Sequence, residues 1–515
     1  MESFFCVNLP KIYSAAQKVF VSKDMNKKIY IVAACVWALL ATACVDEKFT
    51  DDPTAVLAFS CDTLSFDTMF TNVPSRTLSF YVYNRNDKAL NISSVRLGRG
   101  GESYFRYNLD GRIPPENKML ENVEIKAKDS LFVFVEMTAD QNNADFPVYY
   151  LDSMLFVTNG VTQNIKLVVY GQDAVVLDGY ALTANRTLTA ERPYLIFDYL
   201  YVPEDVTLTL AAGTRLYFHD KANLVVDGHL VAQGTAEQPV LMRTDRFDCM
   251  PDEDRTPYDY MPGQWGGVYL QNAHGRHTLT HTHIRGCDAG VIVSGTSIAQ
   301  PSLTLTNCIL HTMTQYGLFA QNANVEVVNC ELSNCGTACF YQLGGEAYVA
   351  HTTIANYYTW GTRQDVAMVI TNYYVDGNLL YLFPVKSAVV ENSIVFGNQS
   401  REIALTRDTI TDAAYNVTIS HSLLKCRQQT DAYFVDNYWA NSQNPDADGV
   451  YHADTVFVNT SIRDIAQTGY YDFHLADRSS ACGKADVAVA ERFPADMEGK
   501  NRLADGAPDL GAYEK

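Results

Sequence analysis

Charged residues are scarce in this sequence: they make up 19% of its 515 residues, whereas hydrophobic residues make up 47%. Intrinsically disordered chains have few hydrophobic and many charged residues, so this composition argues against disorder. Tryptophan is rarer still, with four residues. Helical periodicity is also missing from residues 45–175, where no stretch repeats its apolar residues as a surface helix does. Tyrosine and phenylalanine are plentiful, with 32 and 24 residues. The composition favours a strand-rich chain that can bury more than one core.

Basic residues are also in deficit. Lysine and arginine number 39 against 59 aspartates and glutamates, so the formal net charge is −20 at pH 7. A chain this acidic repels the phosphates of nucleic acids and the head groups of anionic lipids. We therefore expect no nucleic-acid partner, and we expect contact with a membrane only through a lipid anchor.

The first 43 residues are typical of an export signal. The basic pair Lys27 and Lys28 precedes the apolar run 29–40, and small residues lead from there to Cys44. The run is too short for a comfortable membrane span. We expect residues 1–43 to be a leader whose true start is Met25.

The small residues directly before Cys44 resemble the lipobox of bacterial lipoproteins. That resemblance implies that Cys44 is acylated and becomes the mature N-terminus, with residues 44–55 as a linker. Asp46 and Glu47 follow closely and resemble the surface-export signal of lipoproteins from the Bacteroidetes. The implied location is the outer membrane, facing outward, with its periplasmic face as the alternative.

Residues 56–175 alternate between apolar and polar positions, as half-buried strands do. Leu78, Phe80 and Val82 form one such series, and turn signals such as NRNDK at 84–88 separate successive series. Six to eight strands in this length predict a β-sandwich of immunoglobulin type, although the Cys-Trp-Cys signature of antibody domains is absent. We expect this region to act as a spacer.

Residues 176–515 contain a repeat. In VEVVNCEL at 325–332 and LTLTNCIL at 303–310, an aliphatic residue is followed two places later by Asn and then by Cys. The aliphatic column is Leu279, Leu305, Val327, Val349, Val390 and Ile419. The polar column is His281, Asn307, Asn329, His351, Asn392 and His421. Each unit closes with an aliphatic residue: Ile284, Ile309, Leu332, Ile354, Ile394 and Leu423.

Such short strands at solenoid spacing can fold only by stacking coil on coil. Matching side chains then lie about 4.8 Å apart, and we expect the polar column to satisfy backbone groups that point inward at a bend. Cys308 and Cys330 would be stacked neighbours, either small buried residues or a disulfide. With GQWGGVYL at 263–270 and APDLGAYE at 507–514, these coils resemble right-handed parallel β-helix lipoproteins of the Bacteroidetes, of the pectate-lyase-like superfamily. The predicted fold is therefore all-β: a sandwich followed by a β-helix of roughly a dozen coils with a C-terminal cap.

An acidic loop at 244–265 interrupts the predicted strands. Its carboxylates could hold Ca²⁺ while its aromatic rings stack on sugars, or it could simply be a solvated loop. The residues concerned are Asp245, Asp248, Asp252, Glu253, Asp254, Asp259, Tyr258, Tyr260 and Trp265. The carboxylates lack the spacing of a defined calcium loop, which favours the solvated loop. We therefore expect no cofactor, with Ca²⁺ as the alternative.

Three further groups of polar residues stand out. His274, His277, His281 and His283 lie close enough in sequence to suggest zinc, but no acidic fourth ligand is fixed by spacing, so we expect no metal site there. Arg363 in TWGTRQD is interpreted as a polar loop residue. Asp477, Arg478 and Asp509 are expected to pin the C-terminal cap.

The sequence leans against an enzyme. The enzymes among the β-helix proteins that this chain resembles are lyases and polygalacturonases, which carry several aspartates on adjacent strands. The aligned strands of this sequence hold no DxD pair. We expect a monomer that binds a glycan or a surface protein without catalysis. A lyase or hydrolase of acidic polysaccharides and a purely structural stalk are the alternatives.

Overall fold

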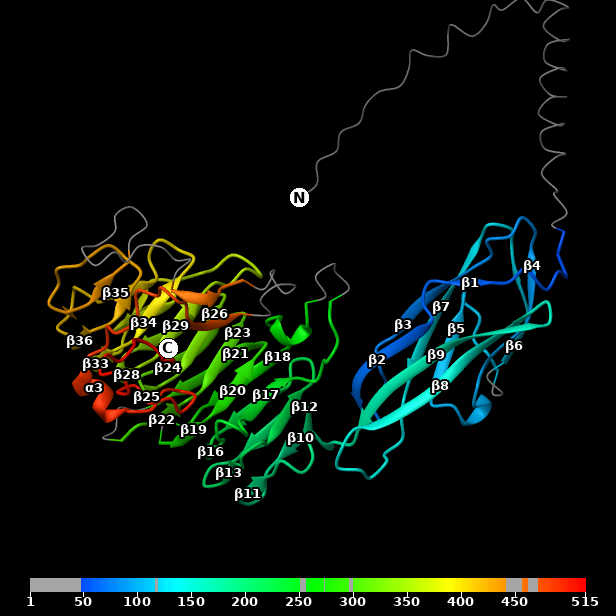
Figure 1. Ribbon diagram of the computed structural model, residues 1–515. Helices are drawn as coiled ribbons and strands as arrows, with labels where there is room; N and C mark the ends of the chain where they lie inside the picture. The colour runs from blue at the N-terminus through cyan, green and yellow to red at the C-terminus, as the bar shows by residue number, and fades with distance from the viewer. Residues whose placement is uncertain are drawn as a thin grey trace, which may run out of the picture. The chain divides into compact units, whose positions relative to one another are not determined.

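The computed structural model describes residues 48–115, 119–250, 256–272, 274–295, 300–440, 456–461 and 471–515. Nearly all of its regular structure is β (Figure 1). The chain forms two compact units. One contains the described residues up to Leu64 with Arg76–Met137 and Leu151–Leu167, and the other contains Ser65–Ser75, Thr138–Tyr150 and Val168–Lys515. Cys44 and the predicted leader lie outside the described residues.

Two antiparallel sheets make up the N-terminal part. One has the strand order β1 (Ala58–Phe59), β3 (Leu78–Tyr83), β7 (Ser130–Met137), β5 (Phe105–Leu109). The other has the order β2 (Thr63–Phe70), β9 (Val161–Gln172), β8 (Val148–Thr158), β4 (Leu90–Leu97), β6 (Met119–Ile125). The rings of Phe59 and Phe80 from the first sheet pack on Phe156 from the second, with centroids 5.1 and 6.3 Å apart. The sheets thus face each other as a sandwich.

The rest of the chain winds into a parallel solenoid with three faces. The first face holds β11 (Arg186–Leu188), β13 (Thr207–Leu210), β16 (His229–Gln233), β19 (His277–Thr280), β22 (Leu303–Thr306), β25 (Asn324–Val328), β28 (Gly345–Ala350), β33 (Val385–Glu391), β36 (Tyr415–Ser420) and β38 (Phe434–Val435). The second face holds β14 (Arg215–Phe218), β17 (Val240–Thr244), β20 (Thr282–Arg285), β23 (Ile309–Met313), β26 (Glu331–Cys335), β29 (Thr353–Asn356), β34 (Ile394–Gly397), β37 (Leu423–Leu424) and β39 (Tyr438–Trp439).

The third face holds β10 (Val175–Ala181), β15 (Asn223–Val226), β18 (Trp265–Leu270), β21 (Cys287–Ser294), β24 (Tyr316–Gln321), β27 (Ala338–Leu343), β30 (Met368–Thr371) and β35 (Ile403–Thr406). Strand β12 (Tyr194–Val202) begins by pairing with β14 and ends by pairing with β15, so this one long strand belongs to both the second and the third face, and β10 pairs along both of its halves. A complete coil therefore contributes one strand to each face, and a strand inside the stack lies between its counterparts in the coils above and below.

The register follows the predicted aliphatic column. Leu279 pairs with Leu305, and the column continues through Val327, Val349 and Val390 to Ile419. Every member is completely buried. Because strands of adjacent coils pair in parallel, one aligned residue per coil fixes the register around that residue, although the register shifts further along some strands, as between Gly345 and Glu346.

The predicted closing column is wrong by one residue in three coils. Ile284 stacks on Leu310 rather than Ile309, and Ile354 stacks on Val395 rather than Ile394. In the next coil the inward residue is Leu424 rather than Leu423, since Val395 pairs with Leu424. Ile394 and Leu423 instead point outward into a second core, where Phe457, Phe473 and Leu510 cover them. Sequence alone offered two adjacent apolar residues, and a distant segment decides which of them faces the main core.

Fewer coils form than the predicted dozen: within the described residues the first face has ten strands. The long interval before Val390 contains an antiparallel hairpin, β31 (Tyr373–Asp376) and β32 (Leu379–Leu382), instead of an extra coil. The described residues after β39 add no coil either: β40 (Phe457–Asn459) pairs with β41 (Asp472–Leu475), and the short helix α3 (Val487–Arg492) follows. We call residues 471–515 the C-terminal segment. No helix within the described ranges is long and apolar enough to cross a membrane.

Candidate functional site

The polar column occupies the bend between the first and second faces. All six residues have positive φ angles: His281 40°, Asn307 55°, Asn329 51°, His351 44°, Asn392 49° and His421 45°. Asparagine and histidine are among the few side chains that tolerate this left-handed conformation. The backbone amide of Asn307 donates to the Val328 carbonyl, and that of Asn329 to the Ala350 carbonyl, so the column is stacked coil on coil. The recurrence of Asn and His therefore reflects the turn geometry.

Their side chains lie on the outside of the bend, which corrects the predicted role. Asn307 Nδ2 donates to His281 Nε2 at 2.9 Å, and Asn392 Nδ2 donates to His351 Nε2 at 3.1 Å. Asn329 and Asn392 also bind the C-terminal segment, through the Ala495 carbonyl and the Asp486 backbone. The polar column is a docking edge for that segment.

The next residue in each coil performs the inward task instead. Those positions are Thr282, Cys308, Cys330, Thr352, Ser393 and Ser422, all completely buried. The Ser393 hydroxyl donates to the Glu391 carbonyl at 2.9 Å and accepts the Thr352 amide at 3.1 Å. Cys330 takes the same place: its thiol donates to the Val328 carbonyl and accepts the Cys308 amide. Cys308 and Cys330 are free thiols, and burial raises the pKa of Cys330.

A second polar pair lies at the bend between the second and third faces. Asn356 accepts a hydrogen bond from the Cys335 amide at 3.1 Å and donates one to the Cys335 carbonyl at 2.9 Å. Asn334 accepts the Tyr357 amide at 2.9 Å. Sequence reasoning missed this pair, although each asparagine follows a member of the polar column by five residues.

The described carboxylates of the acidic loop have separate partners. Asp259 lies between Arg243 and Arg285, at 2.8 and 2.7 Å. Asp245 pairs with His219 at 2.7 Å, and Asp248 pairs with Arg246, whose guanidinium stacks on Tyr258. The structure thus does not gather them around a cation. Asp252, Glu253 and Asp254 lie outside the described residues.

Trp265 does not offer a ring to a sugar, contrary to expectation. Its side chain is completely buried, stacked on Phe218 with centroids 4.1 Å apart, and its indole nitrogen donates to the Arg285 carbonyl. It opens β18 and points into the solenoid core. Of the predicted loop aromatics, Tyr260 alone lines a cavity described below.

The neighbouring histidines are dispersed. His277 points into the interior, where its Nδ1 accepts the Leu230 amide, while His281 is at the bend and His283 faces outward. Across the described ranges, no three His, Cys, Asp or Glu side chains are placed to share a metal ion.

Arg363 is buried, not a solvated loop residue. Its guanidinium binds both carboxylate oxygens of Glu402, at 2.8 and 2.6 Å, and donates to the Asn356 carbonyl. Glu402 in turn accepts the amides of Ala367 and Gln399. This pair closes the bend between the second and third faces. In the cap, Asp509 accepts amides from Gly483 and Lys515, whereas Asp477 pairs with Lys515 at the surface.

Two adjoining cavities lie between the second face and the C-terminal segment, and we call them together the groove. Their volumes are about 380 and 360 Å³. Both are lined by His283 and Ile309 from β20 and β23, and by His474 and Tyr513 from the C-terminal segment. The larger one adds the rings of Tyr260, Tyr471 and Phe473. A large share of its lining is therefore aromatic.

A hydrogen-bonded chain runs along the floor of the groove. Tyr513 donates to Glu331 at 2.5 Å, Ser333 donates to the same carboxylate at 2.8 Å, and His311 Nδ1 lies 2.7 Å from the Ser333 hydroxyl. Since the single Ser333 proton is directed at Glu331, His311 Nδ1 must carry the proton in their shared bond. His311 Nε2 is then an acceptor, and no described protein group donates to it.

The cationic groups of the groove are already paired or neutral. Burial lowers the pKa of His311 to about 3 and that of His283 to about 4, so both are neutral near pH 7. Burial opposes protonation of His474 too, but the carboxylates of Asp472 and Glu498, at 2.6 and 3.2 Å, raise its pKa. Arg285 is held by Asp259. The groove therefore offers aromatic faces and hydrogen-bonding groups without an uncompensated cation.

Sequence reasoning missed most of this site. Glu331 stands in an outward column whose neighbours are Ile309, Thr353 and Ile394, and His311 stands in the adjacent column. A lone carboxylate among apolar repeats was the available signal. The partners in the C-terminal segment had no such signal, because that segment does not repeat.

Residues 266–461 match a known family. Its description is right handed beta helix region. The match and the parallel coils together give a right-handed β-helix as the fold of this part of the chain. No curated protein matches the chain.

The solved structures that are similar to this chain include three that cover about a quarter of it. A family 123 glycoside hydrolase from Clostridium perfringens has 8% identity and a TM-score of 0.17 over 23% of this chain and 26% of its own. PapD-like domain 7 of human CEP192 has 7% identity and a TM-score of 0.16, over 25% of this chain and 95% of its own. The periplasmic chaperone SfaE has 10% identity and a TM-score of 0.15, over 23% of this chain and 58% of its own. The chain thus spans about a quarter of the hydrolase's length, and scores this low carry no argument about activity.

Proposed function

We propose that the protein is a lipid-anchored surface protein that binds an uncharged glycan in the groove without catalysis. The observation that carries this proposal is the lining of the larger cavity: Tyr260 and Tyr471 present partly exposed rings over the buried rings of Phe473 and Tyr513. Its charged groups Arg285 and His474 are paired with Asp259 and Asp472. Aromatic rings pack against the apolar faces of sugars, and hydrogen-bonding groups at the edges fix orientation.

The charge distribution favours a neutral ligand over an acidic polysaccharide. The groove's arginine is occupied by Asp259, and the chain as a whole carries −20. A uronate would therefore meet repulsion without a free guanidinium to bind it. The charge distribution therefore argues against the alternative of a lyase or hydrolase of acidic polysaccharides. The groove argues against a passive stalk, which would not need one.

A glycan array probed with the full chain tests the binding. We expect retention of neutral glycans, and loss of that signal in a double variant, Tyr260→Ala with Tyr471→Ala, which removes two rings from the larger cavity. The matched control is Tyr374→Ala, which removes an exposed tyrosine from the hairpin. Equal retention by both variants would remove the groove from the proposal.

Incubation with uronic-acid polymers separates the rival activity. An enzyme would release unsaturated or reducing ends, whereas the proposed binder releases neither. A chain that binds no glycan and releases no product would favour the stalk.

The anchor is tested separately. Labelling cells with an alkyne fatty acid should mark the protein, Cys44→Ala should abolish the label, and protease added to intact cells should digest the chain if it faces outward. An unlabelled wild-type chain would contradict the lipoprotein proposal.

A further inference from the structure

Strand β35 (Ile403–Thr406) is the last strand of the third face among the described residues, and it pairs only with β30. The inward side chains of Ile403 and Leu405 thus have no counterpart in the next coil. The chain crosses above them between Cys426 and Phe434 and leaves a cavity of about 270 Å³. We call it the end pocket. It is separate from the groove, since no lining residue is shared.

The floor of the end pocket is apolar, and part of its roof is aromatic. Ile403, Leu405 and Phe434 line it together with the rings of Tyr415 and Tyr433, which meet edge to face 5.7 Å apart. Tyr415 is fixed in place because its hydroxyl donates to the Ile370 carbonyl at 2.9 Å. An apolar side chain of a small ligand would complete the packing that the missing strand leaves undone.

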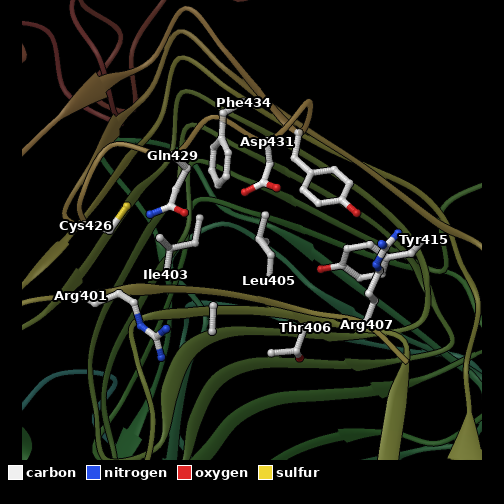
Figure 2. Close-up of a pocket in the computed structure, with 12 residues that line it drawn as sticks. Arg401, Ile403, Leu405, Thr406, Arg407, Tyr415, Cys426, Gln429, Asp431 and Phe434 are labelled. Carbon is white, nitrogen blue, oxygen red and sulfur yellow. The ribbon is translucent and has the colours of Figure 1, made fainter. Parts of the chain in front are cut away.

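Charges of both signs surround this apolar floor. Arg401 precedes β35 and Arg407 follows it, so the two guanidinium groups stand toward opposite ends of the pocket (Figure 2). Figure 2 shows the carboxylate of Asp431 above the floor, between Gln429 on one side and Tyr415 on the other. All three charged side chains are exposed, and no ion pair within the described ranges ties them to another residue.

We propose that the end pocket binds a small zwitterion with an apolar side chain: an apolar amino acid or dipeptide with free termini. The ammonium group pairs with Asp431, the carboxylate pairs with Arg401 or Arg407, and the side chain rests on Ile403 and Leu405. A carboxylate and a guanidinium on either side of an apolar floor complement both ends of such a molecule, and charge-assisted hydrogen bonds to each end give the strongest contacts. A simple anion would leave Asp431 unpaired, and a sugar would leave the guanidinium groups unpaired.

Calorimetric titration of the full chain with the dipeptide Phe-Leu tests this proposal. Binding is expected for the free dipeptide, and about tenfold weaker binding is expected when the amine is acetylated or the carboxylate is amidated, since each change removes one charged contact. Equal binding of the free and blocked forms, or no binding of the free form, would overturn it.

Variants locate the contacts. Asp431→Asn should weaken binding of the free dipeptide about tenfold and leave binding of the acetylated form unchanged. Either Arg401→Gln or Arg407→Gln should weaken binding of the free dipeptide to a similar degree and leave binding of the amidated form unchanged. The arginine that has this effect shows which end of the pocket holds the carboxylate. Arg427→Gln is the matched control, an exposed arginine of the crossing chain that does not line the pocket. If none of the three pocket variants changes the affinity, the site is not the end pocket.

The result is independent of the groove. The double variant Tyr260→Ala with Tyr471→Ala is expected to bind the dipeptide as the unaltered chain does. A parallel loss in that variant would place the dipeptide in the groove and overturn the end pocket.

Discussion

The second and third faces of the solenoid differ in what covers their outward side chains. On the second face, outward Ile394, Phe396 and Leu423 are at most 1% exposed, because the C-terminal segment and β40 pack over them. On the third face, one outward column is also apolar but stays half-buried over five coils: Val225, Tyr269, Ile292, Phe319 and Tyr341. It becomes buried at its next member, Val369, where Val366 joins it in a small cluster. Parallel strands of the same kind thus acquire a second core only where another segment lies against them.

That cover also creates the groove. The paired groups beneath it, such as Glu331 with Tyr513, combine one residue of a coil with one of the C-terminal segment. If this cover stabilises the fold, changes beneath it should lower the free energy of unfolding more than comparable changes on the third face.

Acid should weaken the covered face most. His283 and His311 fold as neutral imidazoles with pKa values of about 4 and about 3, below the ~6.5 of an unfolded chain. Their stabilisation is therefore complete above pH 6.5 and is lost as the pH falls towards 4 and 3. Each group costs about 1.4 kcal/mol per pH unit in that window, so these two histidines together should lower the free energy of unfolding by about 5 kcal/mol between pH 6.5 and 4.5. Glu331 and Glu514, whose pKa values are raised by burial, oppose that fall, so the histidine contribution is the difference between the chain and a variant that lacks both. Urea midpoints measured at several pH values give this slope.

A double variant provides the comparison for that slope. His283→Gln with His311→Gln removes both titrating groups, so its stability should depend less steeply on pH over the same window. An unchanged slope would show that other groups govern the acid response.

The buried pair at the bend between these faces should have the next largest effect. Arg363→Ala leaves Glu402 as an uncompensated buried carboxylate, and breaking such a pair costs about 3–5 kcal/mol. The shift in urea midpoint measures it. Arg478→Ala, which removes an exposed arginine, should change stability by less than about 0.5 kcal/mol.

A matched pair of phenylalanines compares the two faces directly. Phe396 and Phe319 both point outward, from β34 and β24, but Phe396 is 1% exposed. Phe396→Ala should cost about 3 kcal/mol or more, as truncation in a core does, and Phe319→Ala clearly less. Equal losses would mean that the third face is covered as fully as the second.

The smallest effect concerns the bend that leads into the second face. Asn307→Ala places an alanine at a φ of 55°, which should cost about 1–2 kcal/mol. Asn307→Gly should cost less, because glycine adopts this conformation without strain, although it also loses the hydrogen bond to His281. If both substitutions cost the same, the side-chain contact matters more than the turn.

The repeat made the solenoid predictable to the level of individual contacts. Leu279, Leu305 and Val327 could be aligned from their spacing, and a parallel stack leaves them no other partners than one another. The polar column could be found in the same way, but its role could not: the backbone angle that selects Asn307 and its neighbours is invisible in the residue pattern. The sequence also could not tell Ile309 from Leu310 as the inward residue, since both are apolar and adjacent.

Little of the candidate site could be predicted. Tyr260 stood out as part of the acidic loop and His283 as part of a group of histidines, not as parts of one groove. Trp265 was predicted to lie at the surface, but it belongs to the core. Glu331 and Tyr513 are 182 residues apart, and no periodicity connects them.

The amino-acid sequence by itself determined that coils stack and which residues form their inward column, because a repeated unit can bury its apolar residues only against copies of itself. The tertiary structure alone decided where the C-terminal segment lies, which outward residues it buries, and hence where the groove is. The physical reason is that this segment pairs with the coils through single, non-repeating contacts, and their choice depends on the shape and charge of a surface that exists only once the coils are stacked.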